Sequence, residues 1–529
     1  MSIPRSFFRA QWLAAVLILA ALATRWPAVA AGNSFVFNNG AEPETLDPAL
    51  ITGVLEMRVV DALFEGLMRY HPETLAPEPA VAERCEMGGN GLLYTFHLRK
   101  DALWSDGQRV ISGDFLYSWR RVLTPATAAP YAYQLYPVAG AEDFHKGRNS
   151  DFSTVGVSAP DEATLVVRLA RPCPYFLDLA AFPTLYPVPR GAVEKHGDRW
   201  VRPGNLVSNG AFTLTDWKPR ERIELARGAN YWDRASVKLE KVVALPYDEL
   251  ETAYKLYSDG KIHWLADLPP ARLEEARLRP DFYIAPYLGT YFYRFNVKRA
   301  PCDDARVRKA LSLAVDRRLI TEHVLKGMGQ PATWFCPPVS GYEPVPGLTP
   351  NREEARKLLA QAGYGPGGKA LPEIEILYNT SESHKAVAEA LAQQWSEALG
   401  LRVSLRNTEW KIYLSDMDTL NYQVCRAGWI GDYNDPNTFF DMWVTGGGNN
   451  RTGWSNPRYD ELLAQSQREP DRARRLELFR AMERILVEDE LPILPLYIYV
   501  NKGLIRDEVR GFHTNIRGVH PLRALSLAD

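Results

Sequence analysis

The stretch Tyr422-Gln-Val-Cys-Arg-Ala-Gly-Trp-Ile-Gly-Asp-Tyr-Asn-Asp-Pro436 decides the fold, because an apolar run ends there in a turn rich in glycine and carboxylates. The run from Tyr422 to Trp429 predicts a buried strand. Gly428 and Gly431 permit close approach of the backbone, and the pair Asp435-Pro436 then turns the chain. We therefore expect a strand of the core sheet to end at a turn that carries an aspartate and aromatic side chains.

Asp432 is the candidate binding residue of this turn. A carboxylate held beside Trp429 and Tyr433 suits an ammonium group of a ligand. Alternatively, Asp432 caps the turn through its own backbone, as aspartate before Asn and Pro often does. The local sequence leaves both interpretations open.

The segments that precede this strand predict a β-α-β-α-β order, with elements at 374–378, 383–399, 401–406, 409–417 and 422–428. Strand-like and helix-like segments also alternate over the rest of the chain, which favours an α/β fold with mixed sheets flanked by helices. Further strands are expected at 290–296 and 493–500. An amphipathic helix is expected from Leu55 to Tyr70.

The first thirty residues have the pattern of a signal peptide. Arg5 and Arg9 precede an apolar core from Trp12 to Ala23, and Ala28-Val-Ala30 fits a cleavage site. We expect cleavage near Ala30 and release into the periplasm. No cysteine follows the apolar core, so a lipid anchor is not expected.

Length and charge limit the remaining possibilities. Without its leader the chain has 59 basic and 64 acidic residues, a balance that does not favour nucleic acid as a partner. About five hundred residues exceed what one core organises, so two or more domains are expected. The five cysteines are an odd number, so at least one thiol is free unless it pairs between chains.

Motifs for catalysis and for metal or cofactor binding are missing from the sequence. No nucleophile elbow, zinc-protease helix or calcium loop occurs, and the nine histidines lack a second ligand at metal spacing. The segment Gly363 to Lys369 resembles a phosphate loop, but Ala370 replaces the required hydroxyl. We therefore expect no metal, no cofactor and no enzymatic activity. His384 begins a helix, where it is either solvated or directed into a cleft.

Five segments in order resemble the oligopeptide-binding proteins of bacterial ABC importers, the family 5 extracellular solute-binding proteins. They are Asn38-Asn-Gly-Ala-Glu-Pro-Glu-Thr-Leu-Asp-Pro48, Tyr94-Thr-Phe-His-Leu-Arg-Lys-Asp-Ala-Leu-Trp-Ser-Asp-Gly107, Asp114-Phe-Leu-Tyr-Ser-Trp119, Tyr378-Asn-Thr-Ser381 and Arg426 to Pro436.

The resemblance implies a bilobal, Venus-flytrap α/β fold of the periplasmic binding proteins, with an additional third domain. Lobe I would comprise 31–64, 190–288 and the return segment 500–529. Lobe II would be 65–189 and lobe III 289–499, after a signal peptide at 1–30. A peptide would be enclosed in extended form between lobes I and III, with its main chain paired to protein strands.

The resemblance also implies a set of ligand-binding residues. Asp432 would hold the peptide's α-ammonium group. Residues lining the cavity would be Gly428, Trp429, Val54, Trp410 and Tyr131, and the basic groups that meet the peptide carboxylate would be Arg426, His384 and Arg299.

Four positions depart from the family pattern. Met417 replaces an arginine that contacts the peptide carboxylate in relatives, and Thr52 replaces an acidic residue of the cleft. Gly289 and Ile430 occupy the positions of two bridged cysteines. Peptide length and side-chain preference are therefore left open.

The function implied is a monomeric carrier that delivers short peptides to an inner-membrane ABC permease with its ATPase subunits. One alternative is a narrower ligand on the same fold, such as a murein tripeptide, a dipeptide or a metal chelate. An alternative of another class is a secreted peptidase.

Overall fold

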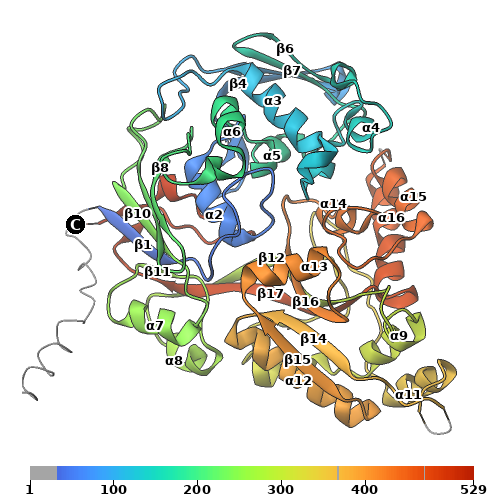
Figure 1. Cartoon of the computed structure of the whole chain (residues 1–529). Coiled ribbons are helices and arrows are strands. Elements are labelled where there is room, and N and C mark those ends of the chain that lie inside the picture. Colours follow the sequence, from blue (N-terminus) through green and yellow to red (C-terminus); the bar gives the residue numbers. More distant parts are fainter. Residues whose placement is uncertain (1–32, 366–367, 470, 529) are drawn as a thin grey trace, which may run out of the picture.

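The computed structural model describes residues 33–365, 368–469 and 471–528, so the predicted signal peptide lies outside the described residues. Its centre is an eleven-stranded mixed sheet in the order β15-β14-β16-β12-β17-β11-β1-β10-β9-β8, with β13 (Gln330–Pro331) attached to β17. Figure 1 shows this sheet running through the middle of the molecule.

One half of the sheet is built from the N-terminal strand and the segment after residue 210. Its strands are β1 (Ser34–Asn38), β8 (Phe212–Lys218), β9 (Arg222–Arg227), β10 (Lys241–Leu245) and β11 (Trp264–Leu265). β1 runs parallel to both β10 and β11, whereas β8, β9 and β10 are antiparallel neighbours. Helix α7 (Leu250–Ser258) packs beside β11 through a separate small core that includes Tyr254 and Tyr257.

The other half confirms the β-α-β-α-β prediction to within two residues at each boundary. Its elements are β14 (Ile374–Asn379), α12 (Glu382–Leu399), β15 (Val403–Thr408), α13 (Trp410–Asp418) and β16 (Val424–Ile430). β14 is parallel to both β15 and β16. The periodic apolar face of α12 is buried against this sheet, with Val387, Leu391 and Trp395 fully enclosed.

Two long antiparallel strands, β12 (Phe282–Phe295) and β17 (Ile493–Ile505), belong to both halves. Their pairing shifts register between Pro286 and Thr290. The strands predicted at 290–296 and 493–500 correspond to one end of each, and the structure extends both through the shift. Neither extension was predicted, because Pro286 and Gly289 interrupt the strand pattern of β12 and Gly503 interrupts that of β17.

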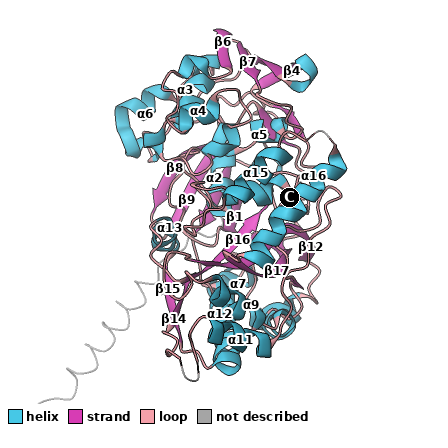
Figure 2. Ribbon diagram, turned by 90° about the vertical axis from the view of Figure 1, so that its right-hand side faces the viewer, coloured by secondary structure: helices cyan, strands magenta, loops and turns pink. Residues whose placement is uncertain are grey.

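A third part lies at one end of the molecule, opposite α12 (Figures 1 and 2). It is a four-stranded antiparallel sheet in the order β4-β5-β7-β6, whose strands are β4 (Ala82–Gly88), β5 (Leu93–Leu98), β6 (Val157–Asp161) and β7 (Thr164–Arg168). Its helices are α3 (Ser112–Leu123), α4 (Ala141–His145), α5 (Phe176–Ala180) and α6 (Arg190–His196).

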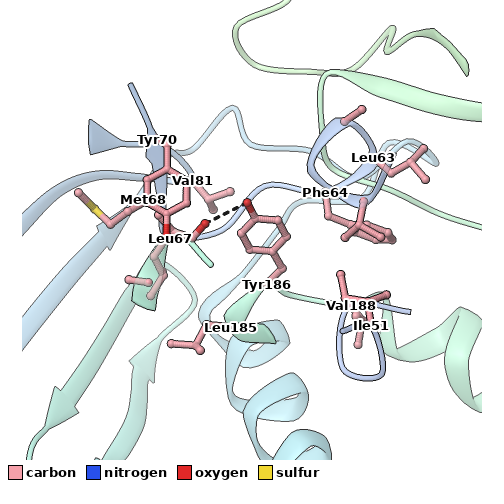
Figure 3. Packing of buried hydrophobic residues seen from close by; sticks show 14 of the residues in the cluster. Ile51, Leu63, Phe64, Leu67, Met68, Tyr70, Val81, Leu185, Tyr186 and Val188 are labelled. Atoms are coloured by element: carbon pink, nitrogen blue, oxygen red, sulfur yellow. Dashed lines mark hydrogen bonds between the residues drawn. The ribbon is translucent and has the colours of Figure 1, made fainter. Parts of the chain in front are cut away.

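The helix predicted from Leu55 to Tyr70 is wrong in its second half. Helix α2 spans Val54–Leu63, and the chain then forms β2 (Met68–Tyr70), which pairs with β3 (Pro77–Pro79). The apolar residues after α2 are buried from an extended chain instead, around Tyr186 in the core that Figure 3 shows. Gly66 permits this packing, because a Cβ atom there would lie 2.7 Å from the Ala180 carbonyl oxygen.

The remaining elements complete the layers. They are α8 (Leu273–Ala276), α9 (Ala305–Leu313), α10 (Arg317–Leu319), α11 (Arg352–Gln361), α14 (Asn437–Phe440), α15 (Pro457–Ser466), α16 (Arg472–Arg484), β18 (Val509–Arg510) and β19 (Ser526–Leu527). The five cysteines all lie in the described ranges and are free thiols. None of the helices in the described ranges combines the length and apolar character of a membrane span.

Candidate ligand-binding site

A cavity of about 430 Å³ lies where β12 and β17 pass between the two halves of the sheet. Its lining comes from α2, from β16 and the turn after it, from β17 and from the C-terminal segment. Eight of the nine residues predicted for the site line it, namely Val54, Tyr131, His384, Trp410, Arg426, Gly428, Trp429 and Asp432.

Arg299 is the predicted residue that the structure does not bring to the cavity. It lies four residues beyond the end of β12, on an exposed turn. The lining of the cavity is formed by residues near the other end of this strand, such as Tyr287. A contact between Arg299 and a ligand therefore has no support from its position here.

At the cavity, β16 presents a main-chain edge that has no second strand partner among the described residues, although the Arg426 carbonyl accepts from the Tyr413 hydroxyl. β14 pairs with it only through Ile376–Val424 and Leu377–Cys425, whereas β12 pairs with the whole strand as far as Ile430. Within the described chain, the segment 426–430 therefore lacks a second strand partner. Alternate residues of a strand direct N–H and C=O groups toward such an edge, so an extended chain lying in the cavity has hydrogen-bonding groups available.

Asp432 is held rigidly at the end of this edge. Its backbone N–H donates to Thr438 Oγ1 at 2.9 Å, and Gln134 Nε2 donates to Asp432 Oδ2 at 3.1 Å. The turn is capped by another residue, because Asp435 Oδ1 accepts from the Asn437 N–H at 3.0 Å. The side chain of Asp432 is therefore not used for capping the turn.

Burial raises the pKa of Asp432 to about 7, although Arg517, Gln134 and Tyr131 act in the opposite direction. Arg517 does not neutralise it as a close ion pair, because its Nε donates to the Gly431 carbonyl at 3.1 Å and its guanidinium stacks 4.3 Å from the Tyr70 ring. A buried carboxylate with neutral hydrogen-bond partners is stabilised by any cation that reaches it.

Aromatic side chains form the walls beside Asp432. The rings of Tyr131 and Trp429 lie 6.0 Å apart, and the Trp429 indole is fixed by a hydrogen bond to the Thr438 carbonyl at 2.7 Å. Gly428 leaves room for Tyr499, since a Cβ atom on Gly428 would lie 2.5 Å from the Tyr499 hydroxyl. These positions combine apolar surface with exposed main chain.

Arg426 lies six residues before Asp432, which in an extended chain corresponds to about 20 Å. Its guanidinium donates to Asn379 Oδ1 at 3.3 Å and to the Tyr499 hydroxyl at 2.8 Å, and it lies 4.8 Å from the Tyr291 ring. Both acceptors are neutral. The positive charge of Arg426 is therefore available to an anionic group of a ligand.

His384 lies at the same end of the cavity as Arg426. Its Nδ1 atom lies 3.4 Å from the Tyr291 hydroxyl oxygen, and it follows Ser381, whose hydroxyl caps α12. Burial, together with Arg426 and Lys502 nearby, lowers the pKa of His384 well below its usual range. A carboxylate at this end would oppose that shift, since it favours the protonated ring.

Several lining residues were missed from the sequence. They include Arg58 on α2, Asn379, Tyr499, Lys502 and Arg517. Gln134, which donates to Asp432 without lining the cavity, was also missed. Extending the strand predicted at 493–500 by two residues would have brought Lys502 under consideration. The others carry no local signal, because their positions in the cavity depend on contacts between distant segments.

The four residues that depart from the family pattern lie in different parts of the structure. Thr52 lines the cavity, whereas Met417 is a buried residue of α13 whose sulfur lies 3.8 Å from an Arg294 nitrogen. Gly289 and Ile430 face each other directly across β12 and β16. A Cβ atom on Gly289 would lie 2.4 Å from Ile430 Cδ1, so the isoleucine fills that space.

The cavity lies between two halves of a sheet that share long strands, and it has a carboxylate at one end and a guanidinium at the other. These features define a bilobal ligand-binding protein. Residues 76–451 match the family model of bacterial extracellular solute-binding proteins, family 5 (middle region). The chain belongs to this family, as the sequence predicted.

Curated relatives match over nearly the whole chain. The periplasmic oligopeptide-binding protein OppA of Escherichia coli K12 is 38% identical over 527 residues, covering 96% of this chain and 95% of the relative. The periplasmic murein peptide-binding protein MppA of the same organism is 39% identical, covering 90% of this chain and 89% of MppA.

Solved structures confirm the predicted fold class. Haemophilus influenzae OppA in complex with the peptide RPPGFSPFR gives a TM-score of 0.89 at 35% identity, covering 94% of this chain and 99% of that one. A structure of E. coli MppA, a murein tripeptide binding protein, gives the same values. The unliganded open form of MppA gives only 0.61 at 36% identity, covering 94% and 98%. The two halves of the present structure are therefore arranged differently from that open form.

Proposed function

We propose that this protein binds short peptides in extended form between its two lobes and delivers them to an ABC permease. The observation that carries the proposal is the main-chain edge of β16, bounded by Asp432 at one end and by Arg426 and His384 at the other. A free peptide has an ammonium group at one end and a carboxylate at the other. Its charges therefore match those of the cavity.

Main-chain hydrogen bonds would supply affinity that does not depend on the peptide's sequence, as in β-augmentation. Asp432 would accept charge-assisted hydrogen bonds from the α-ammonium group, which contribute about 1.5–3 kcal/mol. Arg426 and His384 would bind the terminal carboxylate. Val54, Trp410, Tyr131, Gly428 and Trp429 would line the pockets for side chains.

Lobe boundaries at 288/289 and 499/500 form part of the proposal. They are supported by the register shift between Pro286 and Thr290, where β12 and β17 pass from one half of the sheet to the other. We place the hinge there, because closure requires a few residues that absorb the rotation. Ligand contacts made only in the closed arrangement would shift the equilibrium toward it.

The remaining parts of the proposal follow from the family. The protein would be exported to the periplasm with cleavage near Ala30, act as a monomer, transfer its ligand to an inner-membrane permease with ATPase subunits, and catalyse no reaction. The relatives OppA, a periplasmic oligopeptide-binding protein, and MppA, a periplasmic murein peptide-binding protein, support the periplasmic location and the binding role. The similarity to MppA also keeps a murein tripeptide as the second candidate ligand.

Native mass spectrometry of the purified protein tests the ligand class directly, because tightly bound peptides appear as discrete added masses. Titration of tryptophan fluorescence with defined tripeptides and pentapeptides then gives their affinities. Binding of neither peptide length, together with tight binding of a single non-peptide compound, would contradict the proposal. Fragmentation of a bound peptide by the protein would contradict the absence of catalysis.

A further inference from the structure

We infer that Arg58 forms a subsite for a second carboxylate of the ligand, so that the protein prefers peptides that carry an acidic group besides their C-terminus. This inference rests on the proposed function and narrows its substrate class. Arg58 lies in the middle of α2 and lines the cavity. It is a different group from those proposed to bind the two ends of the peptide.

The guanidinium of Arg58 is positioned by an aromatic ring instead of by an acid. Its centre lies 4.8 Å from the Trp264 ring, which also lines the cavity. Within the described chain, the buried Nε atom of Arg58 has no hydrogen-bond partner. A cation–π contact orients a guanidinium but leaves its N–H donors free.

The charged groups nearest to Arg58 do not neutralise it. Asp267 is the acidic residue that acts on Arg58, and it is already paired with Lys502 at 3.2 Å. Burial, with Arg58 itself nearby, lowers the pKa of His520 to about 3, so that this ring is neutral. Tyr283 and Tyr287, the remaining titratable neighbours, are also neutral because burial raises the pKa of both.

The other cations that line the cavity already have partners. Lys502 is paired with Asp267, and Arg517 donates to the Gly431 carbonyl and faces Asp432. Arg426 is held by Asn379 and Tyr499 in the position proposed for the C-terminus. Arg58 is therefore left with a positive charge in a partly buried place, where a bidentate carboxylate is the matching ligand group.

Two kinds of ligand supply such a carboxylate. One is a peptide with a Glu or Asp side chain. The other is a peptide with γ-linked glutamate, in which the α-carboxylate remains free. Because both present the same group, the experiment must compare them.

Isothermal titration calorimetry with matched tripeptides tests the inference. Each position of an alanine tripeptide is replaced in turn, by Glu in one peptide and by Gln in its matched counterpart. A further tripeptide carries a γ-linked glutamate at the middle position. We expect at least one Glu-containing peptide to bind about tenfold or more tightly than its Gln counterpart, as a charge-assisted pair predicts. Tighter binding of only the γ-linked peptide would assign the free α-carboxylate as the group recognised.

Variants locate the effect. Arg58→Gln should reduce the ratio of Gln-peptide to Glu-peptide dissociation constants to about one, whereas Arg58→Lys should retain part of it. Arg318→Gln removes an equal charge from an exposed position on α10 and should leave the ratio as in the unmodified protein. Binding of the Gln peptide shows that each variant is folded.

Equal binding of the Gln peptides and of all Glu peptides, the γ-linked one included, by the unmodified protein would overturn the subsite and leave the proposed function intact. An unchanged ratio in Arg58→Gln would do the same. Failure of every tripeptide and pentapeptide to bind would instead overturn the proposed function, and the subsite with it.

Discussion

Trp410 Nε1 donates a hydrogen bond to Glu56 Oε1 at 3.0 Å, and this bond joins α13 in one half of the molecule to α2 in the other. Glu56 is fully buried and also accepts from the Glu44 N–H at 3.1 Å. Burial raises the pKa of this carboxyl. Each partner contributes to a contact that opening of the cavity would break.

Trp410→Phe should weaken peptide binding by about three- to tenfold, because losing one hydrogen bond to a carboxylate destabilises the closed form by about 1 kcal/mol. Titration calorimetry gives the affinity, and small-angle X-ray scattering reports any expansion of the ligand-free protein. Trp217→Phe is the matched control, since Trp217 Nε1 donates to Glu42 at the opposite edge of the sheet. A similar loss of affinity in both variants would contradict a role of Trp410 in closure.

Asp432→Asn should weaken binding of free-amine peptides by about 10- to 100-fold, because it removes a charge-assisted contact of about 1.5–3 kcal/mol. N-acetylated peptides should bind the variant and the unmodified protein about equally. Competition with a fluorescent peptide measures both affinities.

Asp435→Asn provides the control within the same turn. Asp435 is paired with Arg475 at 2.7 Å and caps the turn, so its loss should lower thermal stability without changing the preference for a free amine. Equal weakening of free and acetylated peptides by Asp432→Asn would remove the role proposed for this residue.

The affinity for free-amine peptides should depend on pH through Asp432. Its pKa of about 7 in the unliganded cavity falls when an ammonium group binds, so binding releases a proton below pH 7. Affinity is then full above that pKa and declines as the pH falls toward 5. It also declines above pH about 8, where the peptide's own amine loses its proton.

Calorimetry at pH 6 in two buffers of different ionisation enthalpy measures the number of protons released. Up to one proton is expected for the unmodified protein, and Asp432→Asn should abolish the release and flatten the acidic limb of the profile. Proton uptake instead of release would have the wrong sign for this mechanism.

The pair Gly289 and Ile430 should accept a disulfide when both are replaced by cysteine. The residues face each other directly in antiparallel strands, where Cα atoms lie about 4.5–5.5 Å apart, within the range that a disulfide requires. Thiol titration of the unfolded double variant should find the five native thiols alone, because the two new ones are bonded. Gly289→Cys by itself should show a sixth free thiol.

The local pattern of apolar residues was sufficient to predict a strand or helix wherever that element has its own apolar period, as in the segment from β14 to β16. It failed between Leu63 and Tyr70, where the apolar residues continue with a helical period but pack from an extended chain around Tyr186. It also began the first long strand too late, at Thr290, and ended the second too early, at Val500, since pairing across a register shift leaves no local pattern.

The candidate site was predictable where a motif marks it, as at Asp432, and was not predictable where a contact between distant residues creates it. Arg58 appears in the sequence as one cation among many on a helix. Its significance depends on Trp264 and on the pair Asp267–Lys502, which lie more than two hundred residues further along. Arg299, in contrast, lies on an exposed turn away from the cavity.

The incomplete pairing of β14 with β16 means that capture of a peptide and selection among peptides depend on different groups, which respond differently to mutation. Capture of an extended chain depends on N–H and C=O groups, which every residue except proline supplies and which side-chain mutation leaves in place. Under the proposed function, selectivity would depend on side chains that line the cavity, such as Arg58 and Thr52. A lineage can therefore change what it imports by single substitutions, without first losing its ability to hold a peptide.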